Sequence, residues 1–279
     1  MIDVSSIADR VTLDTNGIWR SVDQESVSYP AGGNEACFSL EDASFWFNHR
    51  NRCIVAAVRN LPPRNNGPIF DIGGGNGFVS VGLNRAGFDA VVVEPGPVGA
   101  ANAKARGVHT VICATTKSAG IRRSVLEAVG LFDVIEHVEN DLPFLKEIRN
   151  LLKPGGRLYA TVPAYMALWS HEDELAGHYR RYTLKGFESL VERAGFVVVY
   201  STYIFRVLPL PILLLRALPY RLGIGKASGG QGNSSNDHQP PKGRAAGVIN
   251  AVLDRELLHI ERNGCMRFGG SCLVVARAS

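Results

Sequence analysis

Short apolar runs alternate with helical patterns from Ile69 to about Tyr203. Such alternation is typical of a parallel sheet that is covered by helices. The expected strands are Ile69–Ile72, Ala90–Val93, Thr110–Cys113, Ala128–Phe132, Arg157–Val162 and Val197–Tyr203. The pattern therefore predicts an α/β fold.

Two segments between these strands carry clear helix signals. In Asp141–Lys153 the first residue can cap the helix, Pro143 suits its first turn, and leucine and isoleucine form one apolar stripe. The run Lys153-Pro154-Gly155-Gly156 is expected to end this helix. A second helix is expected over Thr183–Ala194, with Gly195 as its terminator.

Composition and charge narrow the class of protein. The chain has 279 residues, 46% of them hydrophobic and 20% charged, which is ordinary for a soluble globular protein. A net charge of +4 without a Lys/Arg-rich block gives no indication of nucleic-acid binding. The five cysteines form no C-x-x-C pair and the first residues lack the apolar core of a signal peptide, so we expect a cytoplasmic protein.

A glycine-rich motif follows the first expected strand. The stretch IFDIGGGNGFVS places Gly73, Gly75 and Gly77 after an apolar run that ends in Asp71. A strand that leads into such a turn and then a helix is a nucleotide cradle, because glycines let the backbone approach a ligand closely. The dinucleotide fingerprint G-x-G-x-x-G would need its third glycine elsewhere, so the spacing disfavours that class.

Two carboxylates accompany this motif. Glu94 ends the next strand, AVVVE, and a carboxylate there can accept hydrogen bonds from two ribose hydroxyls. Asp71 is expected to be buried near the loop, where it orients the turn or meets the amino group of a cofactor.

The pattern D-x-G-x-G-x-G resembles the first motif of class I S-adenosylmethionine-dependent methyltransferases. The resemblance continues in LFDVIEHVENDLPFLKEIRNLLKPGGRLYATVP, with its EHV and LKPGG motifs, and in the later segments VPA, LWS, GHYRRYT. The aromatic run Phe45-Trp46-Phe47 with Arg50-Asn51 is similar to the N-terminal helix of the same group. The similarity spans about residue 40 to the C-terminus.

This resemblance implies a Rossmann-like fold with a mainly parallel seven-stranded sheet, an antiparallel last strand and helices on both faces. It implies S-adenosyl-L-methionine as the cofactor and methyl transfer to a small-molecule acceptor, with O-methylation favoured. The residues expected to bind the cofactor are Asp71, Gly73, Gly75, Gly77, Glu94, Phe132, Trp46 and Arg50. The alternative is a catalytically silent S-adenosylmethionine-binding protein that acts as a partner or regulatory subunit.

One departure from the group concerns adenine. Many relatives have an acidic residue after the third strand, but this chain reads Val111-Ile112-Cys113-Ala114-Thr115-Thr116. Adenine would then be held by backbone groups, a threonine hydroxyl or apolar walls.

The acceptor end needs groups that position a nucleophile and, for a hydroxyl, help to remove its proton. The candidate catalytic residues are His137, His178 and Asp133, of which two fall where the fourth strand ends. Glu136 could equally cap the next helix. A metal site from Glu136, His137 and Asp173 is conceivable, but its spacing is unspecific and we expect no metal.

The loop after the fifth strand gathers charges and aromatic rings, as a substrate-recognition loop would. Its candidate substrate-binding residues are Trp169, His171, Arg180, Arg181 and Tyr182. The two arginines could bind an anionic acceptor, or one could pair with Glu172 or Asp173 and lock the loop.

Residues 205–260 interrupt the alternation as an insertion. Its apolar segment, Val207–Leu215, contains prolines and is far shorter than the roughly 20 residues of a membrane-spanning helix. The segment could form a lid over an apolar or lipid-linked acceptor, touch a membrane surface peripherally, or make a homodimer contact through 205–220. A polar linker over 224–244 is expected to be mobile.

Four regions are thus expected. They are a helical cap over the cofactor site (1–66), the methyltransferase core (67–204), the insertion (205–260) and the last strand (261–279) that completes the sheet.

Overall fold

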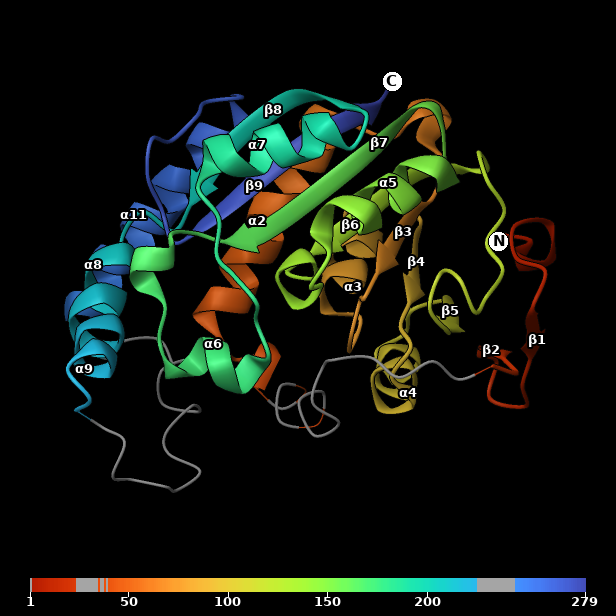
Figure 1. Ribbon diagram of the computed structural model, residues 1–279, viewed down its shortest axis with the longest axis horizontal. Helices are drawn as coiled ribbons and strands as arrows, with labels where there is room; N and C mark the ends of the chain where they lie inside the picture. Colours follow the sequence, from red (N-terminus) through yellow and green to blue (C-terminus); the bar gives the residue numbers. More distant parts are fainter. Residues whose placement is uncertain (1, 24–34, 36–37, 39, 225–243) are drawn as a thin grey trace.

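One twisted sheet forms the centre of the molecule in the computed structural model, which describes all residues except 1, 24–34, 36–37, 39 and 225–243 (Figure 1). The strands are β1 (Val11–Leu13), β2 (Trp19–Ser21), β3 (Ile69–Ile72), β4 (Ala90–Val93), β5 (Thr110–Cys113), β6 (Leu126–Phe132), β7 (Leu152–Pro163), β8 (Phe196–Ile204) and β9 (Ser271–Ala278). Within the described residues these nine strands have the order β1-β2-β5-β4-β3-β6-β7-β9-β8.

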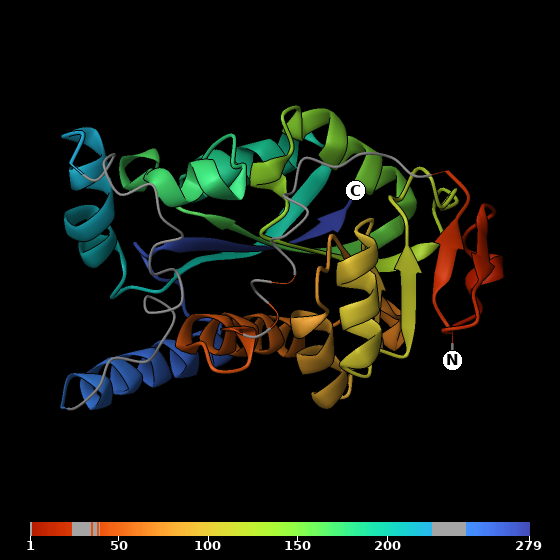
Figure 2. The same ribbon diagram turned by 90° about the horizontal axis from the view of Figure 1, so that it is seen from below.

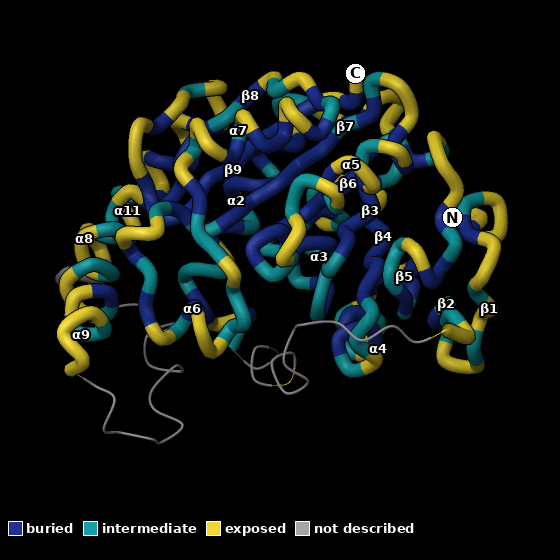
Figure 3. The backbone as a smooth tube through the Cα atoms, in the orientation of Figure 1, coloured by how far each residue is buried: buried dark blue, intermediate teal, exposed yellow. Residues whose placement is uncertain are grey.

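The sheet is mainly parallel, as expected. Strands β2, β5, β4, β3, β6 and β7 run parallel to one another, whereas β9 is inserted antiparallel between β7 and β8. All four residues of both β3 and β4 are buried, which explains why these strands are continuous apolar runs instead of alternating ones (Figure 3). The antiparallel last strand predicted from the sequence is therefore confirmed.

Helices cover both faces of the sheet. They are α2 (Phe45–Asn60), α3 (Phe78–Arg85), α4 (Pro97–Ala105), α5 (Asp141–Leu151), α6 (His171–Ala176), α7 (Leu184–Arg193), α8 (Pro209–Ile212), α9 (Leu218–Arg221) and α11 (Arg244–Glu261). Figure 2 shows α5, α6 and α7 on one face and α2, α3, α4 and α11 on the other. Shorter turns are η1 (Val4–Ser6), η2 (Arg64–Asn66), η3 (Ile135–His137), η4 (Met166–Leu168) and the π-helical η5 (Leu213–Ala217).

The N-terminal region differs from the expected helical cap. Besides α2, it supplies β1 and β2, which form an antiparallel pair and extend the sheet beyond β5 through the neighbours Trp19 and Ile112. The expected seven-stranded sheet therefore has two further edge strands. These strands are short and half-exposed, so they lack the apolar pattern by which a buried strand is recognised.

Two local expectations also need correction. Helix α5 ends at Leu151, and the Lys153–Gly156 run that was expected to follow it as a helix stop lies inside β7. Asn140, not Asp141, occupies the N-cap position of α5, and its side chain makes no capping hydrogen bond. The Asp141 carboxylate instead accepts hydrogen bonds from Arg180 and Tyr182.

The insertion begins with α8, η5 and α9, which follow one another closely at one end of the sheet (Figure 1). Helix α11 then packs along α2, where the Asn60 side-chain amide donates a 2.8 Å hydrogen bond to the Ile260 carbonyl. Most of the linker predicted to be mobile lies outside the described residues. In the part of the chain that the structure describes, no helix is long and apolar enough to cross a membrane.

Candidate functional site

A cavity of about 960 Å³ opens at the carboxyl ends of the parallel strands, the edge where α/β sheets bind their ligands. The glycine-rich loop follows β3, Glu94 follows β4 and Asp133 follows β6, so three separated sequence signals meet in one place. The predicted site residues that line the cavity are Trp46, Arg50, Asp71, Gly73, Gly75, Glu94, Phe132, Asp133, His137, His178 and Arg181.

The glycine loop has the backbone that its sequence demands. Gly73, Gly75 and Gly77 have φ values of 71°, 51° and 74°. This is the left-handed region, which residues other than glycine adopt only at a cost in free energy. Gly77 serves the packing of the loop. A Cβ at this position would lie 2.9 Å from the Cβ of Ala103 on α4 and 3.0 Å from Val108, and Gly77 is not among the described residues that line the cavity.

Glu94 is held at the loop by two backbone groups. Its carboxylate accepts hydrogen bonds from the N–H of Gly75 at 2.9 Å and of Gly96 at 2.7 Å, and the residue is buried. Burial raises the pKa of Glu94, and the two backbone donors oppose that rise. The strand end thus presents a buried carboxylate directly against the glycine turn.

Asp71 lies in β3, just before the glycine turn. It is fully buried and accepts a 2.8 Å hydrogen bond from the Ser80 hydroxyl on α3. Burial raises its pKa to about 6. The contact with Ser80 ties the end of β3 to the helix that follows the loop, in keeping with an orienting role.

An ion pair in the cavity lining joins Arg50 on α2 to Asp133, which follows β6. The Arg50 guanidinium pairs with the Asp133 carboxylate and lies 4.6 Å from the ring centroid of Trp46. Asp133 also accepts a 2.8 Å hydrogen bond from the Thr161 hydroxyl on β7. Contacts with α2 and β7 therefore hold Asp133 at the end of β6. The same ion pair holds Arg50 beside Trp46.

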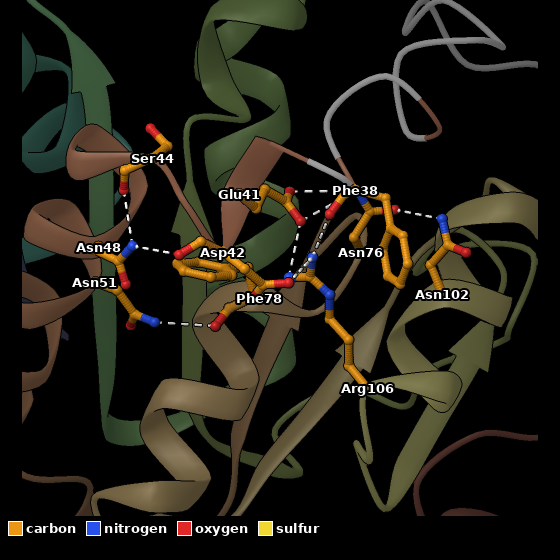
Figure 4. Close-up of polar contacts among 10 residues, drawn as sticks. All are labelled: Phe38, Glu41, Asp42, Ser44, Asn48, Asn51, Asn76, Phe78, Asn102 and Arg106. Carbon is orange, nitrogen blue, oxygen red and sulfur yellow. Dashed lines mark hydrogen bonds and ion pairs between the residues drawn. The ribbon is translucent and has the colours of Figure 1, made fainter. Parts of the chain in front are cut away.

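A polar network beside the glycine loop was not anticipated (Figure 4). The buried Glu41 forms a 2.9 Å ion pair with Arg106 and accepts hydrogen bonds from the Asn76 side chain at 3.3 Å. Asn102 on α4 donates to Asn76 at 2.9 Å. The segment before α2 is thereby attached to the glycine loop, and no local motif marks Glu41 because its partners are distant in sequence.

Two histidines lie together in the cavity lining. The rings of His137 and His178 lie 4.7 Å apart between centroids in an edge-to-face arrangement. Burial and the neighbouring His178 lower the pKa of His137 to about 4. Beside them, the carboxylate of Glu136 is buried, and neither of its oxygens has a hydrogen-bond partner among the described residues.

Asp173 organises this end of the cavity. Its carboxylate lies 2.9 Å from Nδ1 of His178 and accepts hydrogen bonds from Arg181 at 2.7 Å and the Ser170 backbone at 2.9 Å. The pKa of Asp173 is lowered because these hydrogen bonds and the Arg181 charge outweigh its burial. Of the two arginines, Arg181 therefore locks the loop, which is the second of the roles considered from the sequence.

The other predicted substrate-binding residues are placed elsewhere. Trp169, His171, Arg180 and Tyr182 are not among the described residues that line the cavity. His171 is exposed and faces Glu174 at 3.2 Å, while Arg180 and Tyr182 bind Asp141. A substrate role for these four residues stays a prediction.

The insertion supplies an apolar wall. Leu208, Pro211, Ile212 and Leu215 line the cavity together with Phe144 of α5. Another part of the wall contains Ala114, Thr115 and Thr116, the segment where the sequence lacks the acidic residue expected from the resemblance. The cavity thus has an apolar wall beside a cluster of ionisable groups.

Comparison with known proteins agrees with this arrangement. The methyltransferase domain family matches residues 46–201, more than half of the chain. No curated protein matches this chain. Among solved structures, a chain from the complex of the Haloferax volcanii Trm112 methyltransferase activator with a methyltransferase is 16% identical, with a TM-score of 0.55 and coverage of 89% of this chain and 93% of that one.

Two further structures are similar. A SAM-dependent methyltransferase from Thermotoga maritima is 18% identical, with a TM-score of 0.50, covering 88% of this chain and 94% of that chain. Haemonchus contortus phosphoethanolamine N-methyltransferase 2, in complex with S-adenosyl-L-methionine, is 16% identical with a TM-score of 0.53. That match covers 90% of this chain and 58% of the larger one. At these identities the likeness concerns the fold.

Proposed function

The chain belongs to the methyltransferase domain family, and on this premise we propose that it transfers a methyl group from S-adenosylmethionine to a hydroxyl oxygen of a small, largely apolar acceptor. The observation that carries the proposal is that one cavity is lined by the glycine loop, by Glu94 and by a cluster of ionisable residues: Asp133, Glu136, His137 and His178. The first two suit the cofactor, and the third suits the acceptor.

The residues present fit the cofactor. Gly73, Gly74 and Gly75 bring bare backbone to the cavity wall, and Glu94 is buried beside them with a carboxylate that can accept hydrogen bonds from ribose hydroxyls. Ala114 and Thr115 would flank adenine. We assign Arg50 and Asp133 to the region between cofactor and acceptor, since both line the cavity and form an ion pair there.

When bound, S-adenosylmethionine would supply an electrophilic methyl group: the acceptor oxygen would form the new O–CH₃ bond, the electrons of the broken S–CH₃ bond would stay on sulfur, and the hydroxyl proton would pass to solvent. The protein's task is to hold the oxygen in line with the methyl group. The apolar wall of Leu208, Ile212 and Leu215 would hold the body of the acceptor. Asp133, His137 and His178 remain the candidates for contact with its hydroxyl.

We favour a lid role for the α8–α9 segment over membrane or dimer contact. Ile212 and Leu215 line the cavity, and Leu215 is 76% exposed, as its neighbours Leu210, Leu214 and Leu222 are more than half exposed. A segment with one side in the cavity is suited to covering an apolar acceptor.

The test is methyl transfer from S-adenosylmethionine with a deuterated methyl group, measured by mass spectrometry. The acceptors would be apolar phenols and alcohols, each paired with an amine of the same skeleton. The proposal expects labelled ether from hydroxyl acceptors. Label on the amines alone would overturn O-methylation, and cofactor binding without transfer to any acceptor would favour the silent binding protein.

A further inference from the structure

The Glu136 side chain is in an unusual position. The residue is 1% exposed, lines the cavity, and leaves both carboxylate oxygens without a hydrogen-bond partner among the described residues. A buried polar group without a partner is costly, and a buried charge without one is more so. Buried carboxylates of this kind are usually paired with a charge or bound to a metal ion.

Two imidazoles complete a ligand set around it. One ligand atom each from Glu136, His137 and His178 can be chosen so that all three lie within 4.8 Å of one another. The η3 turn supplies the first two residues, and the loop after α6 supplies the third. The sequence had suggested Asp173 as the third ligand, but the structure uses it differently.

Asp173 does not join this ligand set but holds one of its histidines in place. Its carboxylate holds Nδ1 of His178 at 2.9 Å, which leaves Nε2 as the nitrogen available to a ligand. Histidines that bind metals commonly engage a carboxylate or carbonyl through the other ring nitrogen, and this contact fixes their orientation. Arg181 and the Ser170 backbone in turn fix the Asp173 carboxylate.

We propose that Glu136, His137 and His178 bind one divalent first-row transition-metal ion at the acceptor end of the cavity. Imidazole with carboxylate suits ions such as Mn²⁺, Co²⁺ and Zn²⁺. This proposal differs from the expectation of no metal that the sequence alone gave.

The role of this metal ion rests on the proposed function, because the ion would act on the hydroxyl group that receives the methyl group. Three protein ligands leave coordination positions open for the acceptor. The ion would bind the hydroxyl oxygen and lower its pKa, so that the proton passes to solvent before the oxygen takes the methyl group. His137 and His178 then act as ligands, and acceptors whose hydroxyl can reach the ion are preferred over apolar amines.

A second cluster, His49, Cys53 and Glu256, also has three ligand types close together. Its carboxylate is already engaged, because Oε1 of Glu256 faces His49 at 2.9 Å and accepts from the Phe205 N–H at 2.6 Å, while Oε2 accepts from the Arg206 N–H at 2.9 Å. This buried group connects α2, α11 and the end of β8, so we assign it to structure.

The test is a titration of chelator-treated full-length protein with Co²⁺, followed by visible d–d absorption. One equivalent should bind to the wild type. Glu136→Gln and His178→Asn should each weaken the affinity at least about tenfold. The matched controls Glu147→Gln and His109→Asn change exposed residues outside the cavity lining and should bind Co²⁺ like the wild type.

Three outcomes would overturn the metal site: no stoichiometric binding by the wild type, unchanged affinity in Glu136→Gln, or a sulfur-to-cobalt charge-transfer band that Cys53→Ser removes. Calorimetry with S-adenosylhomocysteine on the same samples separates this proposal from the proposed function. A wild type that binds Co²⁺ but not S-adenosylhomocysteine would contradict the function alone. Cofactor binding without Co²⁺ binding would contradict the metal site alone.

Discussion

The Glu94 carboxylate lies 2.9 Å from the backbone nitrogen of Gly75, so the acid that follows β4 is hydrogen-bonded to the loop that follows β3. Two parallel neighbours in the sheet thereby meet at one corner of the cavity. The relationship explains why a lone carboxylate at a strand end carries functional information when a glycine turn precedes it. It also makes the corner sensitive to single substitutions.

Glu94→Gln should weaken S-adenosylmethionine binding by roughly ten- to a hundredfold. Hydrogen bonds to a charged group contribute about 1.5–3 kcal/mol, and the amide can replace only part of them. Calorimetry on the variant would measure the loss. Glu192→Gln, an exposed acid on α7, is the matched control. Equal affinities in the two variants would remove Glu94 from the cofactor site.

Gly77→Ala should destabilise the fold more than Gly87→Ala does. Both glycines have positive φ, 74° and 92°, so the new side chain strains the backbone and lowers the stability of both variants. Only at Gly77 would the new Cβ meet Ala103 at 2.9 Å, whereas at Gly87 nothing lies within 4 Å.

Overpacking of this kind typically costs about 1–3 kcal/mol, and that is the expected difference between the two variants in urea unfolding. Equal unfolding free energies would show that α4 does not approach the loop as closely as described.

Asp71→Asn should change how stability depends on pH. Burial raises the pKa of Asp71 from its ordinary 3.8 to about 6, so the folded protein binds this proton more tightly than the unfolded chain. The favourable contribution is complete below about pH 4 and is lost as pH rises through 6. A shift of this size corresponds to about 3 kcal/mol.

The asparagine variant should therefore gain stability relative to the wild type between pH 4 and pH 8, while its affinity for S-adenosylmethionine falls. Urea unfolding at pH 4, 6 and 8 measures the first effect. A difference in unfolding free energy that is the same at all three pH values would contradict the buried, titrating carboxylate.

Ile212→Asn should raise KM for an apolar acceptor without changing the affinity for S-adenosylmethionine. Ile212 lines the cavity from α8, and a polar side chain there would weaken the apolar wall. Leu222→Asn, at a residue that is 70% exposed and outside the described cavity lining, is the control. An unchanged KM together with a change in oligomeric state would favour a dimer contact over a lid.

The sequence was most informative where local pattern decides structure. Strands β3, β4 and β5 coincide with the predicted ranges, since each is a buried apolar run bounded by turn residues. The glycine loop and Glu94 could be found for the same reason, because a motif of fixed spacing determines both the backbone and its place at the sheet edge.

Contacts between segments that are distant in the sequence could not be predicted from local patterns. The ion pair of Glu41 with Arg106 and the pairing of β2 with β5 depend on how the N-terminal segment lies across the finished sheet. Arg180 is predicted from the sequence to bind substrate, and its contact with Asp141, 39 residues earlier, is one that no local pattern indicates. Charge in a loop indicates that a partner is needed, and only the tertiary structure shows which partner it is.

A crystal structure with S-adenosylhomocysteine would test the central claim most directly. We predict electron density along Gly73–Gly75, with the ribose hydroxyls hydrogen-bonded to the Glu94 carboxylate and the sulfur facing the end of the cavity that contains Asp133 and His178. Density at another surface, or none at a ligand concentration that saturates binding in solution, would contradict the account.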